Sequence, residues 1–141
     1  MNKQSNKVLI NISSYLLVLF FITLVSNNVT AQDVNTRISK AIQSGSSTEL
    51  SKFFNNSIDL TIPESEGTYS KVQAEQILKS FFLKYPPVSF TINHKGNSND
   101  GSVYAIGTYK SKTNSFRTYY LSKPVEGQLL IHQLKFETRE D

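Results

Sequence analysis

The sequence predicts an α+β domain in which a curved antiparallel sheet wraps around one long helix. Three observations lead to this fold class. Apolar residues recur at helical spacing in three segments, all before residue 86. Alternating strand patterns follow, and the last four are joined by connections too short for a parallel crossover. Helices that precede an antiparallel sheet are typical of the α+β class.

The first 31 residues predict a cleavable signal peptide. A basic start with two lysines is followed by the apolar run 15–25 and by the small residue Ala31. Cleavage between Ala31 and Gln32 would release one α+β domain, residues 32–141, to the periplasm or the cell exterior. The alternative is an uncleaved anchor, because residues 8–25 approach the roughly 20 residues that span a bilayer, but polar residues interrupt that stretch.

Composition narrows the function classes. The chain has no cysteine, which excludes both disulfides and the thioether lipid of a lipoprotein, so no stable membrane anchor is expected after cleavage. Two lysines lie in the leader, which leaves 13 basic against 11 acidic residues and a net charge of +2 for the domain. These basic residues form no stripe, so a nucleic-acid partner is not expected.

Two short helices are predicted at the start of the domain. Asp33 fits the N-cap of the first, whose apolar residues recur at helical spacing up to Ile42 before Gly45 stops it. Thr48 then fits the N-cap of a second helix. Its apolar side would hold Leu50, Phe53 and Phe54.

The middle of the chain predicts a strand, a turn and the long helix. Residues 57–62 alternate perfectly until a proline ends the strand, and residues 64–69 predict a turn with a short pairing strand. Ser70 and Gln73 form a capping box. Apolar residues then step by three and one as far as Tyr85, which predicts one long amphipathic helix.

The C-terminal half predicts four strands that form an antiparallel meander across the long helix. Turn residues containing Asn, Asp, Thr or Gly separate them. The strands cover approximately residues 88–95, 102–110, 116–123 and 128–138.

Three stretches resemble a known protein family. They are residues 49–53, residues 66–78 with the run Gly-Thr-Tyr-Ser-Lys, and residues 104–108. Together they resemble a family of small exported proteins of Gram-negative bacteria that is known only as a domain of unknown function. That family is similar to the nuclear transport factor 2-like (cystatin-like) superfamily. The resemblance implies a cone-shaped sheet around a long helix with a cavity at its open end, but it transfers no catalytic residue.

The strand phase suggests which side chains would line such a cavity. His94 is in phase with Phe90, and His132 is in phase with Leu134, so both histidines are predicted to face the helices. An apolar pocket with a hydroxyl and an imidazole suits a small apolar ligand. The same residues would also suit an ordinary aromatic core. The predicted lining is Phe81, Phe82, Phe90, Phe116, Tyr120 and His132.

The opposite phase predicts an outer sheet face that is too apolar to remain in water. A two-fold homodimer that packs sheet on sheet is the simplest explanation. A larger partner and a misassigned strand phase are the alternatives. The residues predicted on this face are Tyr104, Ile106, Tyr119, Leu121, Leu129 and Ile131.

These observations lead to three functional hypotheses. A non-enzymatic domain that binds a small ligand or a protein, through the cavity or the sheet face, comes first. A small isomerase or dehydratase is the alternative, with His132 as acid or base and Tyr120 as hydrogen-bond donor. Asp59 could assist only if its strand turned that side chain to the cavity. A purely structural dimer subunit is the third.

The sequence also lacks several signatures of chemistry. It has no His or carboxylate cluster at metal-ligand spacing, no glycine-rich phosphate loop and no Gly-x-Ser-x-Gly nucleophile elbow. We therefore expect no metal and no cofactor.

Overall fold

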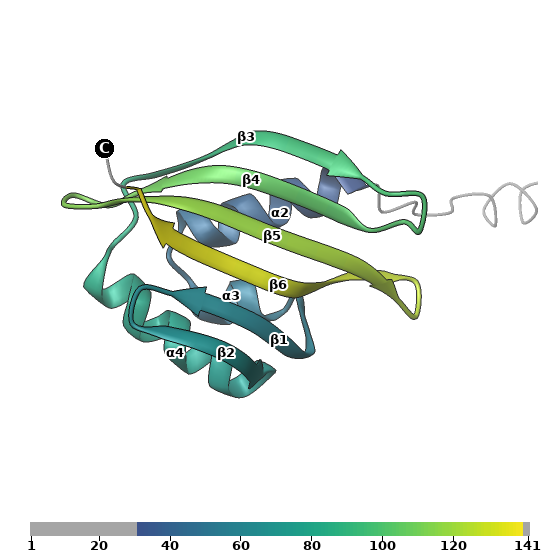
Figure 1. The fold of residues 1–141 in the computed structure, drawn as a ribbon, viewed down its shortest axis with the longest axis horizontal. Coiled ribbons are helices and arrows are strands. Elements are labelled where there is room, and N and C mark those ends of the chain that lie inside the picture. The colour runs from purple at the N-terminus through teal and green to yellow at the C-terminus, as the bar shows by residue number, and fades with distance from the viewer. Residues whose placement is uncertain (1–30, 140–141) are drawn as a thin grey trace, which may run out of the picture.

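The computed structural model describes residues 31–139, which form one curved sheet with three helices packed behind one face (Figure 1). The predicted α+β class is confirmed. The predicted signal peptide lies outside the described residues, apart from Ala31. The elements are α2 (Ala31–Gln43), α3 (Ser47–Ser51), β1 (Phe54–Ile62), β2 (Ser65–Ser70), α4 (Lys71–Lys84), β3 (Ser89–Asn97), β4 (Val103–Lys110), β5 (Ser115–Val125) and β6 (Gln128–Thr138).

The strands lie in the order β2-β1-β6-β5-β4-β3. The last four form the predicted antiparallel meander, and β1 pairs antiparallel with β2. One pair departs from the antiparallel expectation, because β1 lies parallel to β6. That pairing is accessible because α4 and the first three strands of the meander separate β1 from β6 in the chain, far more than the dozen residues that a crossover needs. It joins the N-terminal hairpin to the meander in one sheet.

Both N-terminal helices begin elsewhere than predicted. Helix α2 starts at Ala31, so Asp33 lies in its first turn rather than at the N-cap. A carboxylate is also favourable there, because it faces the positive end of the helix dipole. Helix α3 is capped by Ser46, whose hydroxyl accepts a hydrogen bond from the Glu49 amide at 3.2 Å. The chain leaves the helix early enough that Phe54 begins β1.

The long helix α4 forms as predicted. Ser70 and Gln73 make both hydrogen bonds of the capping box. Its buried stripe faces the sheet and consists of Ala74, Leu78, Phe81 and Phe82. At its C-terminal end, the buried Tyr109 hydroxyl donates a hydrogen bond to the Tyr85 carbonyl. This bond anchors the last turn of the helix to β4.

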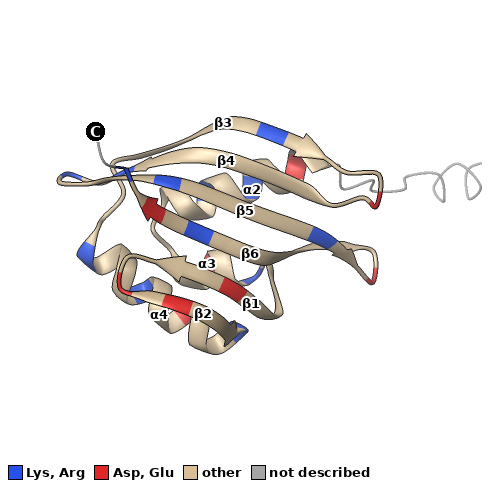
Figure 2. Cartoon of the chain, viewed as in Figure 1, with Lys and Arg blue, Asp and Glu red and all other residues tan. Residues whose placement is uncertain are grey.

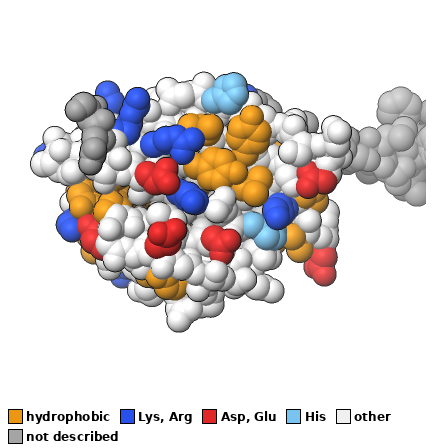
Figure 3. Space-filling model, in the orientation of Figure 1, with side chains coloured by type: hydrophobic (Ala, Val, Ile, Leu, Met, Phe, Trp, Pro, Cys, Tyr) orange, Lys and Arg blue, Asp and Glu red, His pale blue; other side chains and the backbone are white. Residues whose placement is uncertain are grey.

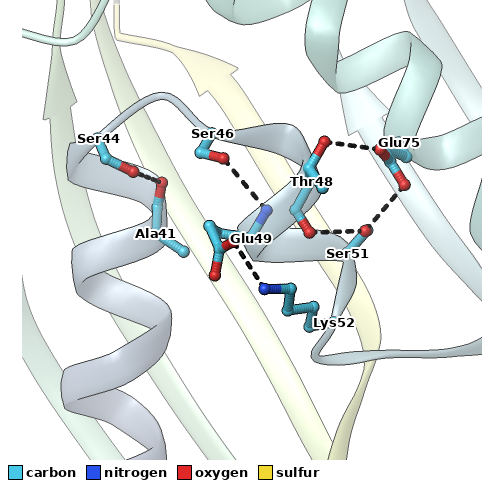
Figure 4. Close-up of polar contacts among 8 residues, drawn as sticks. All are labelled: Ala41, Ser44, Ser46, Thr48, Glu49, Ser51, Lys52 and Glu75. Atoms are coloured by element: carbon cyan, nitrogen blue, oxygen red, sulfur yellow. Dashed lines mark hydrogen bonds and ion pairs between the residues drawn. The ribbon is translucent and has the colours of Figure 1, made fainter.

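A carboxylate clamp joins α3 to α4 (Figure 4). Glu75 accepts one hydrogen bond from the Thr48 hydroxyl and another from the Ser51 hydroxyl, each at 2.9 Å. Both bonds favour the charged carboxylate and hold the pKa of Glu75 below its ordinary value of 4.5. Thr48, predicted as a helix cap, therefore serves to position the two helices.

We expect the Glu75→Gln variant to be less stable than the wild type near neutral pH. An amide carries no charge and has one acceptor oxygen, so the Thr48 and Ser51 hydroxyls can no longer both donate to a charged carboxylate. A lowered carboxyl pKa contributes stability above the unfolded-state pKa and loses it as the pH falls through the folded-state pKa. The difference in free energy of unfolding between variant and wild type should therefore be smaller in acid than near neutral pH. Urea unfolding under the two conditions measures it.

The matched control is Glu66→Gln. Glu66 is exposed in β2, and its side chain makes no hydrogen bond or ion pair among the described residues. Its substitution should leave the unfolding midpoint nearly unchanged at either pH. An equal effect of both substitutions would contradict the clamp.

Candidate functional site

The interior that was predicted to hold a cavity is filled by aromatic rings. Phe81 is 2% exposed and lies at the centre of the cluster. Its ring centroid is 4.7 Å from that of Phe136 and 5.3 Å from that of Phe116. Phe82, Tyr85 and Tyr109 also contact it. At these distances, in edge-to-face and tilted arrangements, the rings pack against one another rather than against a ligand.

Phe90 is buried separately, on β3. It packs against Gly107 of β4, where an added Cβ would come within 2.8 Å of the ring. Thus five of the six residues predicted to line a cavity, all except His132, are buried. Among the principal cavities of residues 31–139, only Phe82 of the predicted set borders one, at the surface beside α3. The rings are core.

Tyr120 lies on the inner face, as its phase predicted, but its hydroxyl is already bonded. It is fully buried, and it donates a hydrogen bond to Asn35 Oδ1 at 2.8 Å. Burial raises the pKa of Tyr120 well above its usual range. Asn35, on α2, is itself 4% exposed. This pair links the first helix to β5 and leaves the hydroxyl no free role as a donor to a substrate.

His132 does not join Tyr120. The pairing of β5 with β6 shifts between Leu121 and Ser122, so that Gln133 and Ile131 are matched while His132 is the extra residue of a bulge. His132 is half-buried, and its Nδ1 donates to the Leu130 carbonyl at 2.9 Å. Among the described residues, no hydrogen bond connects it to Tyr120 or to a carboxylate. The acid-base pair of the enzyme hypothesis is not assembled.

The same bulge corrects the predicted outer face. Ile131 was expected there, but it is fully buried and faces the core. Leu129, near the start of β6, is partly buried and also packs against the core. One extra residue reverses the alternation of side chains for every earlier position in the strand. Strict alternation therefore predicted the wrong face for these residues.

His94 is the second correction. The register of β3 against β4 shifts between Ile92 and His94, so that Ile92 pairs with Gly107 while His94 pairs with Ile106. His94 is therefore on the outer face and exposed, 6.3 Å from the ring of Tyr104 by centroids. Asp59 is exposed as well, opposite Ile58 and Leu60, as its strand pattern predicted.

The remaining residues predicted on the outer face do lie together. Tyr104 is paired with Leu121, and Ile106 with Tyr119, across β4 and β5. All four side chains are half-buried. We call them the outer patch. Figure 3 shows hydrophobic side chains gathered on this face, with histidine side chains near them.

Charges of both signs surround the outer patch (Figure 2). Arg117 bonds to Glu137 at 3.2 Å on β5 and β6, and Lys135 is paired opposite Tyr119. On the neighbouring strands, Asp59 accepts a hydrogen bond from the Thr68 hydroxyl at 2.6 Å. The face thus has an apolar centre and a polar rim, which is the composition of a protein interface.

The principal cavities of the described residues lie at the surface around the ring cluster, and of its rings only Phe82 borders one. The most enclosed of the principal ones has a volume of about 250 Å³ and lies between α2, the α3-β1 junction and the β5-β6 hairpin. Sequence reasoning missed it, because its residues come from three elements that only the fold brings together. Its lining is Val34, Arg37, Lys52, Phe53, Gly127, Gln128, Leu129 and Leu130.

Two further findings concern residues 31–139. No helix in that range is long and apolar enough to cross a membrane. The same residues contain no group of three or more His, Cys, Asp or Glu side chains placed to hold a metal ion.

Comparison with known proteins identifies the family. Crystal structures of DUF4783 family proteins from Bacteroides uniformis and Bacteroides ovatus are both 28% identical to this chain, with TM-scores of 0.72 and 0.71. They cover 77% and 82% of this chain and 99% and 100% of their own chains, respectively. A nuclear transport factor 2-like protein of unknown function from Cytophaga hutchinsonii shares the fold at 11% identity and a TM-score of 0.58, covering 81% of this chain and 94% of its own.

No match was found among curated proteins. The family model of DUF4783, a domain of unknown function, matches residues 35–137. That match covers nearly the whole sheet, most of α2 and all of α3 and α4, and the bacterial relatives have the fold that the sequence resemblance implied. The chain therefore belongs to the DUF4783 family and has a nuclear transport factor 2-like fold.

Proposed function

We propose that this domain is a non-enzymatic interaction module that pairs with a second copy through the outer face of its sheet. The observation that carries the proposal is the outer patch. Two tyrosines and two aliphatic side chains lie together on adjacent strands, partly open to solvent. A contiguous apolar patch with a polar rim typically marks an interaction site.

The packing of the interior also favours a non-enzymatic module. An isomerase or dehydratase would need an open pocket with an acid-base pair. Phe81 and Phe116 instead pack ring against ring in the centre of the cone. The two weak catalytic candidates are separately bonded, Tyr120 to Asn35 and His132 to Leu130. A ligand inside the cone would have to displace core rings at a cost of several kcal/mol.

Charge favours a second copy as the occupant. The rim carries basic residues on β5 and β6 and acidic residues on β1, β2 and the end of β6 (Figure 2). A surface with one sign of charge would repel its own copy, whereas a mixed rim lets each sign meet its opposite across a two-fold axis. The small net charge of the domain adds little repulsion.

Sedimentation equilibrium of the purified protein over a range of micromolar concentrations tests this proposal. A self-associating two-fold interface gives a mass that rises from monomer to dimer with concentration. A monomer mass throughout the range would contradict the proposal.

We further propose that the domain works outside the cytoplasm, because its leader has the composition of a signal peptide. Mass spectrometry of the protein recovered from a Gram-negative host should give a chain that begins at Gln32. A chain that retains residues 1–31 would contradict cleavage.

A further inference from the structure

The most enclosed principal cavity lies beside the β5-β6 hairpin. Three segments form it: the first turns of α2, the α3-β1 junction, and the β5-β6 hairpin with its start of β6. The hairpin tip is tight, with positive φ angles of 48° at Glu126 and 78° at Gly127. The walls of the cavity are therefore formed by α2, the end of α3, this tight turn and the start of β6, rather than by a long loop.

One wall of this cavity is apolar. Val34 is 4% exposed, while Phe53 and Leu129 are partly buried and pack against the core. The amide of Ile131 donates to the Phe53 carbonyl at 2.7 Å, which fixes the wall to β6. A short hydrocarbon chain laid on this wall would remove apolar surface from water, at about 0.8 kcal/mol per CH₂ group.

Two basic side chains line the same cavity. The Arg37 guanidinium lies 5.0 Å from the centroid of the Phe53 ring, a cation-π distance that holds it beside the apolar wall. Lys52, the C-cap residue of α3, also lines the cavity. The lining contains no carboxylate among the described residues. The cavity thus offers positive charge next to apolar surface.

The carboxylates that pair with these cations lie outside the lining. Asp33 is 4.0 Å from Arg37, and Glu49 is 2.6 Å from Lys52. All four side chains are more than half exposed, at 56% and 52% for the first pair and 61% and 57% for the second. Exposed pairs of this kind contribute only about 0–1 kcal/mol, so a ligand carboxylate can compete for either cation.

We propose that this cavity binds a small amphipathic carboxylate. Its head group lies with Arg37 and Lys52, and its apolar chain lies against Phe53 and Leu129. The volume of about 250 Å³ is below the roughly 300 Å³ at which drug-sized pockets begin. The ligand is accordingly a short-chain acid rather than a large lipid. This site is independent of the outer patch.

Calorimetric titration of the purified protein with octanoate tests the proposal. Octanol keeps the chain without the charge, octylamine reverses the charge, and acetate keeps the head without the chain. Saturable binding of octanoate, with much weaker binding of the other three probes, is the expected result. Absence of saturable octanoate binding, or equal binding of octanol or acetate, would overturn the proposal.

Variants then locate the site. Arg37→Gln and Lys52→Gln should each weaken octanoate binding about tenfold, which corresponds to ~1.4 kcal/mol. Both residues are exposed, so circular dichroism should show an intact fold. Lys112→Gln removes an exposed cation from the β4-β5 turn, outside both the cavity and the outer patch, and is the matched control, with unchanged affinity expected. Octanoate binding that survives both cavity substitutions, or that falls equally in the control, places the ligand elsewhere and refutes the site.

Discussion

The Phe81→Ala variant is expected to lose about 3–5 kcal/mol of its free energy of unfolding. Phe81 touches five other rings, which come from α4 and its C-cap and from β4, β5 and β6. Removing its ring deletes these contacts and leaves a hole that the surrounding sheet cannot close. Since domains of this size are stable by only ~5–15 kcal/mol, a loss of this magnitude is a large fraction of the total. Urea unfolding followed by circular dichroism measures it.

Leu83→Ala is the control on the same helix. Leu83 is 74% exposed, so its truncation should change the free energy of unfolding by no more than about 0.5 kcal/mol. A loss of less than 1 kcal/mol for Phe81→Ala would mean that the interior tolerates a void there. That result would return the interior of the cone to consideration as a ligand cavity.

The Ile106→Glu variant is expected to remain folded but to lose self-association. Ile106 is one of the four residues of the outer patch and is paired with Tyr119 on β5 and with His94 on β3. A two-fold interface would bring each new carboxylate into a desolvated apolar contact, where a charge costs several kcal/mol. A penalty of about 3 kcal/mol weakens dimerisation roughly a hundredfold. Sedimentation equilibrium reports the change in mass.

Val72→Glu adds the same charge on the helical side of the domain. Val72 is 69% exposed on α4, away from the outer face, so the dimer should persist. Equal dissociation in both variants would point to general charge repulsion, and persistence of the dimer in Ile106→Glu would place the interface elsewhere. Either result contradicts the proposed face.

Local patterns in the sequence were sufficient for most elements. The capping box at Ser70 and the step of apolar residues in α4 are contained within one helix, so its neighbours could not override them. The same holds for β6, which spans the predicted residues. Turn residues set the ends of the meander strands to within a few positions. These features depend on contacts between residues close in the chain.

Features that depend on distant contacts were predicted less well. The parallel pairing of β1 with β6 brings together segments more than sixty residues apart, and no local pattern specifies it. The bulges at His132 and near His94 reverse side-chain phase, and strict alternation gave the wrong face for His94 and for Ile131. A bulge has no reliable composition, because it is selected by sheet curvature and pairing.

The candidate site was predicted only in part. The four residues of the outer patch lie on β4 and β5, whose register with each other is unbroken, so their phase could be counted correctly. The aromatic residues of the interior were identified too, but composition cannot separate rings that line a cavity from rings that fill one. Tyr120 shows why: its partner Asn35 lies 85 positions away in the chain.

Site-specific cross-linking tests the central claim most directly, because the chain has no native cysteine. Single cysteines would replace each residue of the outer patch in turn, and a short thiol-specific linker would join copies. A two-fold interface predicts efficient cross-linked dimers from this face and little from Val72→Cys or Leu83→Cys on α4. Equal yields from both faces, or dimers only from α4, would contradict a dimer built on the outer face of the sheet.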